Sequence, residues 1–166
     1  MKKIYGEKLQ VIISLLEKAD RPTADYLVAH KTPIFTGGIG ASKSAIWTLW
    51  GSIILNKDQY PNEETSLDAW WISVICHEVC HLRQGPLTAF SVYGELEAWQ
   101  VGFGIYQSLT KSQPSPLISR LLQLPLGYDL SILREARALM RQHAGPKYRI
   151  DLYPLLPLHI WAKHIF

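Results

Sequence analysis

The sequence contains little cysteine: Cys76 and Cys80 are the only two, and they are four residues apart. If this stretch is helical, a disulfide between them would span a single turn and be strained. We therefore expect two free thiols in a protein that works in a reducing compartment. The spacing excludes a disulfide bond within the chain as a source of stability.

The chain also has little net charge. Its 17 Lys and Arg are nearly balanced by 14 Asp and Glu, which leaves a net charge of +3. The basic residues are scattered along the chain, so a nucleic-acid partner is not predicted. No uninterrupted apolar run approaches the length of a membrane span. The start, Met1 to Lys3, resembles a secretion signal, but charged residues interrupt the following segment and no cleavage site is evident. We therefore expect a cytoplasmic protein without a membrane span.

The chain is rich in apolar and aromatic residues. Its 166 residues are 48% hydrophobic and 19% charged, as is typical of a soluble chain large enough to bury one core. Six tryptophans and eight tyrosines predict a core or cleft with many aromatic side chains. We therefore expect a single domain, residues 1–166, of the α+β class and mainly helical.

The apolar pattern predicts where the elements lie. Apolar residues recur at helical spacing in four segments besides the motif described next: 3–19, 91–111, 117–124 and 130–143. Short β-branched and aromatic runs, separated by glycine turns, predict three strands: 32–36, 45–50 and 53–55. These strands are expected to form a small antiparallel sheet just before the helix that carries the motif.

The most informative stretch runs from Leu67 to Gln84 and reads as one helix, with a polar cap in 65–68 and a glycine-proline stop after it. His77 and His81 are spaced i and i+4, which puts them within about 40° on one face. Two imidazoles can then bind one metal ion. Glu78 points about 100° away from His77, so it suits a general base rather than a ligand. The plainer alternative is a buried helix whose histidines bond to neighbouring residues.

A catalytic zinc site needs a third protein ligand. The candidates are His30, His143, His159, His164, Cys80, Glu95 and Glu97. In the predicted helix 91–111, Gly94, Ala98 and Gly102 form a smooth stripe that permits a close crossing with the metal helix. Glu97 lies beside this stripe, whereas Glu95 is near the helix start, where a carboxylate is favourable for the dipole alone. The sequence therefore favours Glu97 as the third ligand.

With Glu97-Ala98 downstream of His77 and His81, the chain resembles the zinc metallopeptidases of the gluzincin group, in which a later helix supplies a glutamate. The segment from His77 to Gln84 is also similar to the His-Glu-x-x-His-x-x-Gln form of many small bacterial members. The resemblance covers about Ala69 to Gln107. It implies a zincin-like fold, one zinc ion on His77, His81 and Glu97, Glu78 as general base, and a peptide or protein substrate.

Some assignments stay open at this stage. The group usually adds a phenol or imidazole at the oxyanion, and four residues are equal candidates: Tyr93, Tyr106, His143 and His159. Trp70 and Gln84 lie on the metal face of the helix and are candidates to line a cleft, with core packing the favoured role of Trp70. A non-catalytic zinc-containing binding or regulatory domain is the alternative function. Gly37 to Ser44 is similar to a phosphate-binding P-loop, but it lacks the glycine before Lys43 and precedes a strand, so nucleotide binding is the weaker reading.

Overall fold

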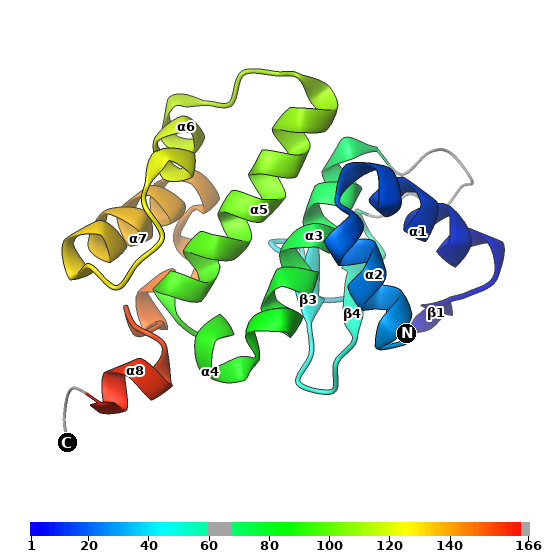
Figure 1. Ribbon diagram of the computed structural model, residues 1–166, viewed down its shortest axis with the longest axis horizontal. Helices are drawn as coiled ribbons and strands as arrows, with labels where there is room; N and C mark the ends of the chain where they lie inside the picture. The colour runs from blue at the N-terminus through cyan, green and yellow to red at the C-terminus, as the bar shows by residue number, and fades with distance from the viewer. Residues whose placement is uncertain (60–67, 164–166) are drawn as a thin grey trace.

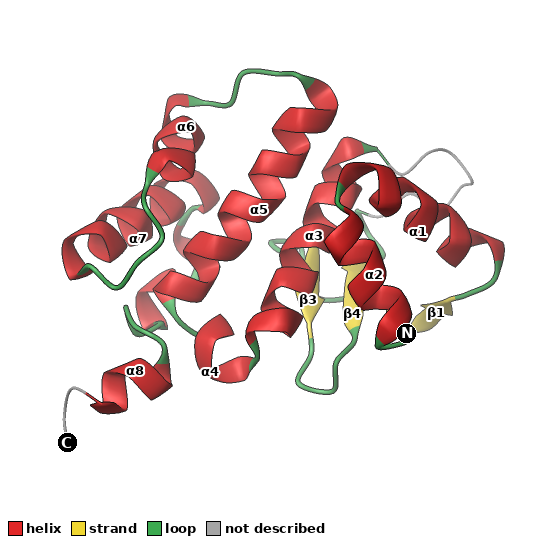
Figure 2. Cartoon of the chain, in the orientation of Figure 1, coloured by secondary structure: helices red, strands yellow, loops and turns green. Residues whose placement is uncertain are grey.

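The computed structural model describes residues 1–59 and 68–163. Its architecture is mainly helical with a small sheet at one side, which confirms the expected α+β class (Figures 1 and 2). The helix α3, Ala69–Gln84, lies at the centre, with α5, Val92–Thr110, packed along it. Nothing in the described residues forms a helix long and apolar enough to cross a membrane.

The motif helix forms as predicted, with its start moved to Ala69. The Asp68 carboxylate accepts a hydrogen bond from the Trp71 backbone N–H at 3.1 Å, so Asp68 is the cap. The other residues of the predicted cap, 65–67, lie outside the described residues. Helix α3 ends at Gly85, whose φ of 71° is unfavourable for other residues.

The sheet has four strands: β1, Lys2–Ile4; β2, Ile34–Gly37; β3, Ala45–Trp47; and β4, Ile53–Asn56. Their order is β1-β2-β4-β3. The β3–β4 hairpin is antiparallel, but β3 lies on the outer side of β4, so β2 and β4 pair directly and run parallel. The sheet is therefore mixed, and the expectation of an antiparallel sheet is corrected. Strand β3 is one of its two edges.

The N-terminal segment also differs from the prediction. Residues 2–4 form the edge strand β1 instead of the start of a helix, and α1, Glu7–Ala19, begins only after Gly6. Gly6 has a φ of 61°, which separates the two elements. The helix α2, Arg21–Ala29, was not predicted. Together with the sheet and α3 these elements enclose the first apolar core.

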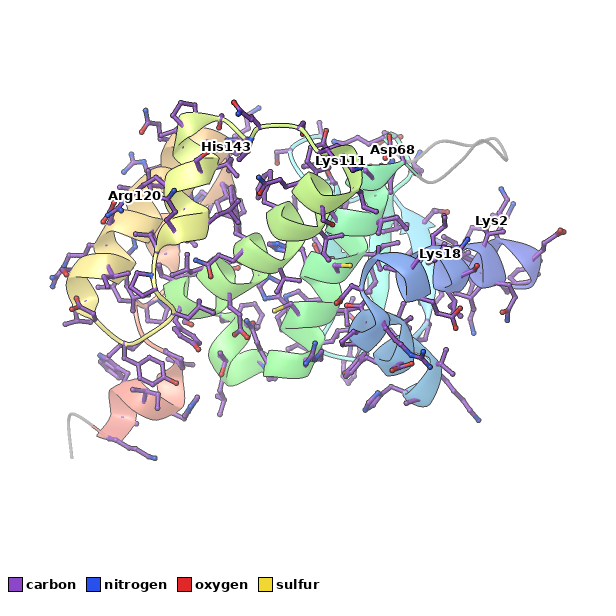
Figure 3. All side chains as sticks on the ribbon, turned by 45° about the horizontal axis from the view of Figure 1, so that its top comes forward. Lys2, Lys18, Asp68, Lys111, Arg120 and His143 are labelled. Atoms are coloured by element: carbon purple, nitrogen blue, oxygen red, sulfur yellow. The ribbon has the colours of Figure 1, made fainter. Side chains whose placement is uncertain are left out.

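A second apolar core lies on the other side of α5. It is enclosed by elements near those predicted and by short C-terminal turns: α6, Pro116–Gln123; α7, Leu130–Ala144; η1, Pro146–Tyr148; η2, Ile150–Leu152; and α8, Leu158–Lys163. The short α4, Pro86–Ala89, joins α3 to α5. Figure 3 places four exposed cations at separate points of the surface, in keeping with scattered charge: Lys2, Lys18, Lys111 and Arg120.

Candidate metal centre

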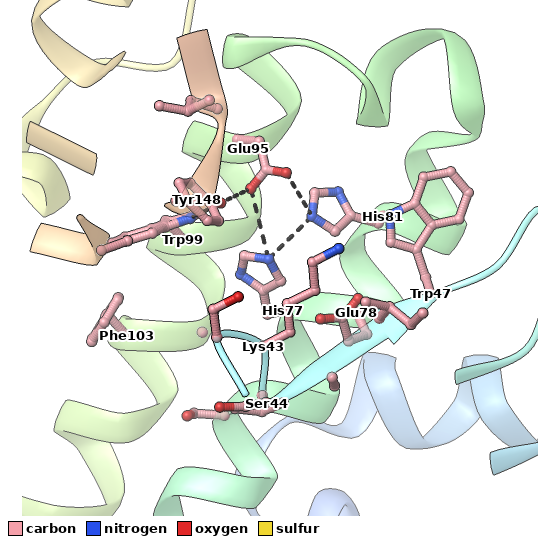
Figure 4. Close-up of a pocket in the computed structure, with 18 of the residues that line it drawn as sticks. Lys43, Ser44, Trp47, His77, Glu78, His81, Glu95, Trp99, Phe103 and Tyr148 are labelled. Atoms are coloured by element: carbon pink, nitrogen blue, oxygen red, sulfur yellow. Dashed lines mark hydrogen bonds and ion pairs between the residues drawn. The ribbon is translucent and has the colours of Figure 1, made fainter. Parts of the chain in front are cut away.

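Three side chains from two helices converge at the centre of the molecule. His77 and His81 project from α3, and their Nε2 atoms lie 3.1 Å apart. Glu95, in the first turn of α5, brings Oε2 to 3.9 Å from His77 Nε2 and Oε1 to 3.7 Å from His81 Nε2. Figure 4 shows the three side chains pointing toward one another. These three residues could hold a metal ion.

The separations between these atoms fit a small tetrahedral ion. Zinc binds imidazole nitrogen and carboxylate oxygen at about 2.0–2.2 Å, which puts two ligand atoms of a tetrahedron about 3.3 Å apart. The 3.1 Å between the two histidine nitrogens is close to this value. The distances from the histidines to Glu95 are somewhat longer, at 3.7 and 3.9 Å, and each is measured to a different carboxylate oxygen. Two imidazoles and one carboxylate are also the donor set of a known class of catalytic zinc site, with a fourth position left open.

Hydrogen bonds fix which nitrogen of His81 faces the centre. The amide nitrogen of Gln84 donates to Gly94 O and to Glu97 Oε2, both at 2.9 Å, and this sets the orientation of the amide. Its Oε1 therefore faces His81 Nδ1, at 3.1 Å, and Nδ1 must be the protonated donor. The lone pair of Nε2 is left toward His77.

His77 is held in the same way. It bonds to the backbone of Ala98, and because this contact raises the pKa of His77, the ring donates to the carbonyl. Burial, and then the neighbouring His81, lower the pKa of His77 well below its ordinary value, so the ring is neutral. The two Nε2 atoms then face each other at 3.1 Å. A cation shared between them would satisfy both nitrogens, so the arrangement suits a metal ion.

Gln84→Leu is expected to weaken metal binding about 10–100-fold, because His81 would lose the partner that orients its ring. The measurement is a titration of variant and wild-type protein against a competing chelator. Ser108→Ala is a matched control on α5, since the Ser108 hydroxyl bonds only to the nearby Ile105 carbonyl among the described contacts. Equal affinity in the Gln84→Leu and wild-type proteins would show that this hydrogen bond does not organise the site.

Glu97, the third ligand that the sequence favoured, is not part of this group, and Glu95 stands in the place expected for it. Around a helix of 3.6 residues per turn, Glu95 lies within about 20° of Gly102 and Glu97 about 140° from it. Gly102 marks the face of α5 that crosses α3, because a Cβ there would lie 3.3 Å from His77 Cβ. Gly94 instead packs against the backbone of Thr88, so the small-residue stripe does not face α3 along its whole length.

Glu78 lies beside the three residues without joining them. Burial, and after it the Glu95 carboxylate, raise the pKa of the Glu78 carboxyl to about 8, against the opposing effects of the Trp47 backbone N–H and the Lys43 ammonium. Trp47 belongs to the edge strand β3, so the sheet holds this carboxyl in position. A cation at the histidines would lower the pKa toward its ordinary range. A buried carboxylate with a pKa near neutrality is suited to proton transfer.

Tyr148, which the sequence did not single out, supports Glu95. Its hydroxyl accepts a hydrogen bond from Trp99 Nε1 at 2.6 Å and donates a short one to Glu95 Oε2. Burial is the main cause that raises the pKa of Tyr148 well above its ordinary value, so the phenol keeps its proton. Tyr148 lies in η1, just after a Gly-Pro break, and no periodic pattern marks such a position.

The structure distinguishes among the other candidates for the oxyanion and for the third ligand. Of the four candidates for the oxyanion, all within the described residues, His143 alone lines the cavity around the metal centre, so Tyr93, Tyr106 and His159 are not brought to it. His30 is exposed and bonds to Tyr26 O. His164 lies outside the described residues.

The two cysteines do not join the metal centre. Both are buried free thiols, as expected. Burial is the largest cause that raises the pKa of each to about 12, so neither offers a thiolate ligand.

A cavity of about 470 Å³ opens onto the metal centre. Its walls come from the edge strand β3, the helices α3, α5 and α7, and the η1–η2 segment. Trp70 lines it, whereas packing in the core was its expected role, and Gln84 lies behind the histidines. The cavity is large enough for part of a peptide or a small molecule.

Comparison with models of protein families, with curated proteins and with solved structures finds no match to this chain. The function therefore has to be inferred from the geometry of the metal centre and its cavity.

Proposed function

We propose that the protein is a zinc-dependent metallopeptidase, and that His77, His81 and Glu95 hold the ion. The observation that carries the proposal is the convergence of these three side chains beside a separate buried carboxylate, Glu78, in one cavity. A bound Zn²⁺ supplies Lewis acidity and lowers the pKa of water toward neutrality. Glu78 then accepts a proton from the attacking water and returns it to the leaving amine.

Two further features support an extended peptide as the substrate. Strand β3 pairs only with β4 among the described strands, so no described strand covers its outer edge, where the Trp47 N–H bonds to Glu78. The same strand lines the cavity. An extended peptide can add to such an edge through backbone hydrogen bonds, which would lay its carbonyl groups past the metal centre.

The test is the metal content and the metal-dependent turnover of the purified protein. Elemental analysis should find about one equivalent of zinc. Incubation with a mixture of unstructured peptides should give cleavage products by mass spectrometry, a chelator should abolish them, and added zinc should restore them. Cleavage that persists in metal-free protein would contradict the proposal. Bound zinc without cleavage of any peptide would favour the alternative, a zinc-containing binding or regulatory domain.

A further inference from the structure

The loop between β2 and β3 has a function other than the phosphate cradle that its glycines suggest. It leads into strand β3 at Ala45, so no helix N-terminus collects its backbone N–H groups. Instead the side chain of Asn56, fully buried at the end of β4, donates to Gly40 O at 2.9 Å and to Lys43 O at 2.7 Å. Two bonds from one rigid side chain fix the loop, and they fix the backbone of Lys43 in particular.

The Lys43 side chain points into the cavity of the metal centre. Figure 4 shows it extending toward His77 and His81, and its charge lowers the pKa of Glu78. Within the described residues its ammonium group forms no salt bridge, so a fixed backbone presents a cation to the cavity. The glycine-rich loop therefore positions a lysine beside the metal centre and does not form a phosphate-binding site.

The charge around the cavity favours an anionic guest. Among the described residues that line it, the carboxylates are Glu78 and Glu95, and two lysines, Lys43 and Lys147, balance them. A divalent cation on the histidines leaves an excess of positive charge. A concave site with such an excess attracts anions and concentrates them.

Much of the rest of the wall is aromatic. Large apolar rings from different elements line the cavity, among them Trp47, Trp70, Phe90 and Phe103. Such a wall binds a large apolar side chain by burying its surface. The cavity thus offers an apolar subsite and a cation within one small volume.

We propose that Lys43 determines specificity by pairing with a carboxylate of the bound peptide, next to a large apolar side chain of that peptide. The carboxylate comes either from an acidic side chain or from a free C-terminus. That this peptide is also a substrate rests on the proposed peptidase function, whereas the binding preference does not. A hydrogen-bonded ion pair of this kind is expected to raise affinity about tenfold.

The test measures equilibrium binding through the fluorescence of the tryptophans in the cavity, with zinc-loaded protein in a Glu78→Gln background that prevents cleavage. Three peptides separate the two sources of carboxylate: acetyl-Phe-Glu-amide, acetyl-Phe-Gln-amide, and acetyl-Phe-Gln with a free C-terminus. Wild-type Lys43 should bind one or both acidic peptides about tenfold more tightly than the neutral one. Lys43→Met should remove this preference, and Lys43→Glu should shift it toward acetyl-Phe-Lys-amide.

Lys57→Met is the matched control, because Lys57 follows β4 but pairs with Asp58 at 3.4 Å and lies outside the cavity lining. It should keep the preference. The inference is overturned if the peptides do not bind, if wild-type Lys43 shows no preference, or if Lys43→Met retains it. Turnover of the same peptides with Glu78 intact separates the two proposals. Preference without cleavage contradicts the peptidase alone, and cleavage without preference contradicts the role of Lys43 alone.

Discussion

Glu95→Ala is expected to lose its zinc at chelator concentrations that leave wild-type protein loaded, whereas Glu97→Ala keeps it. Glu95 Oε1 and Oε2 lie 3.7 and 3.9 Å from the two histidine nitrogens, so removal of this carboxylate reduces a three-ligand site to two. Affinity should fall by roughly three orders of magnitude or more, about 4 kcal/mol or more of binding free energy. The measurement is a zinc titration against a competing chelator.

Glu97→Ala is the matched control, because it removes a second glutamate side chain, two residues farther along the same helix. Glu97 accepts a hydrogen bond from Gln84 at 2.9 Å, and Gln84 in turn orients His81. Its loss should therefore cost about 10–100-fold in affinity at most. Zinc lost from Glu97→Ala but retained by Glu95→Ala would reverse the assignment. Retention by both variants would place the third ligand elsewhere.

The features that sequence predicted well are local ones. The spacing of His77 and His81 fixes their common face as soon as the segment is helical, and the cap and stop of α3 are close to it in the chain. The α+β class and the main helices follow from apolar periods in the same way. The identity of the third ligand is different, because it depends on how α5 is rotated about its own axis.

That rotation is set by packing between distant segments. The stripe of Gly94, Ala98 and Gly102 correctly indicated a close approach of α5, but it did not show that Gly94 faces Thr88 while Gly102 faces His77. The predicted strands had the same limit. Their composition located them, whereas the parallel pairing of β2 with β4 depends on where the β3–β4 hairpin lies in the sheet.

The residues around the metal centre that sequence missed lack any local pattern. Tyr148 lies in a short turn about 50 residues beyond Glu95, and only tertiary structure brings their side chains together. Lys43 was noticed for its glycine-rich context, but its direction depends on the Asn56 side chain. The sequence therefore indicated a candidate metal site through the two histidines, whereas the residues around them could be identified only from the fold.

The second large effect is expected for Glu78→Gln, which should keep its zinc and its fold and lose peptidase activity by about 10²–10⁴-fold. Glutamine preserves the size of the side chain and can still accept the hydrogen bond from the Trp47 backbone N–H. It cannot take a proton from water at any working pH. Metal content should be unchanged, because Glu78 lies outside the group of His77, His81 and Glu95.

The measurement combines three readouts on the same Glu78→Gln sample: zinc by elemental analysis, thermal unfolding, and kcat/KM on a cleaved peptide. Glu135→Gln is the control for a change of charge, since Glu135 is paired with Arg120 on the surface and does not line the cavity. It should retain activity. Full activity in Glu78→Gln would exclude Glu78 as the general base. Loss of zinc with the fold intact would instead make Glu78 a ligand, because only a residue that binds the ion directly would empty the site when its charge is removed.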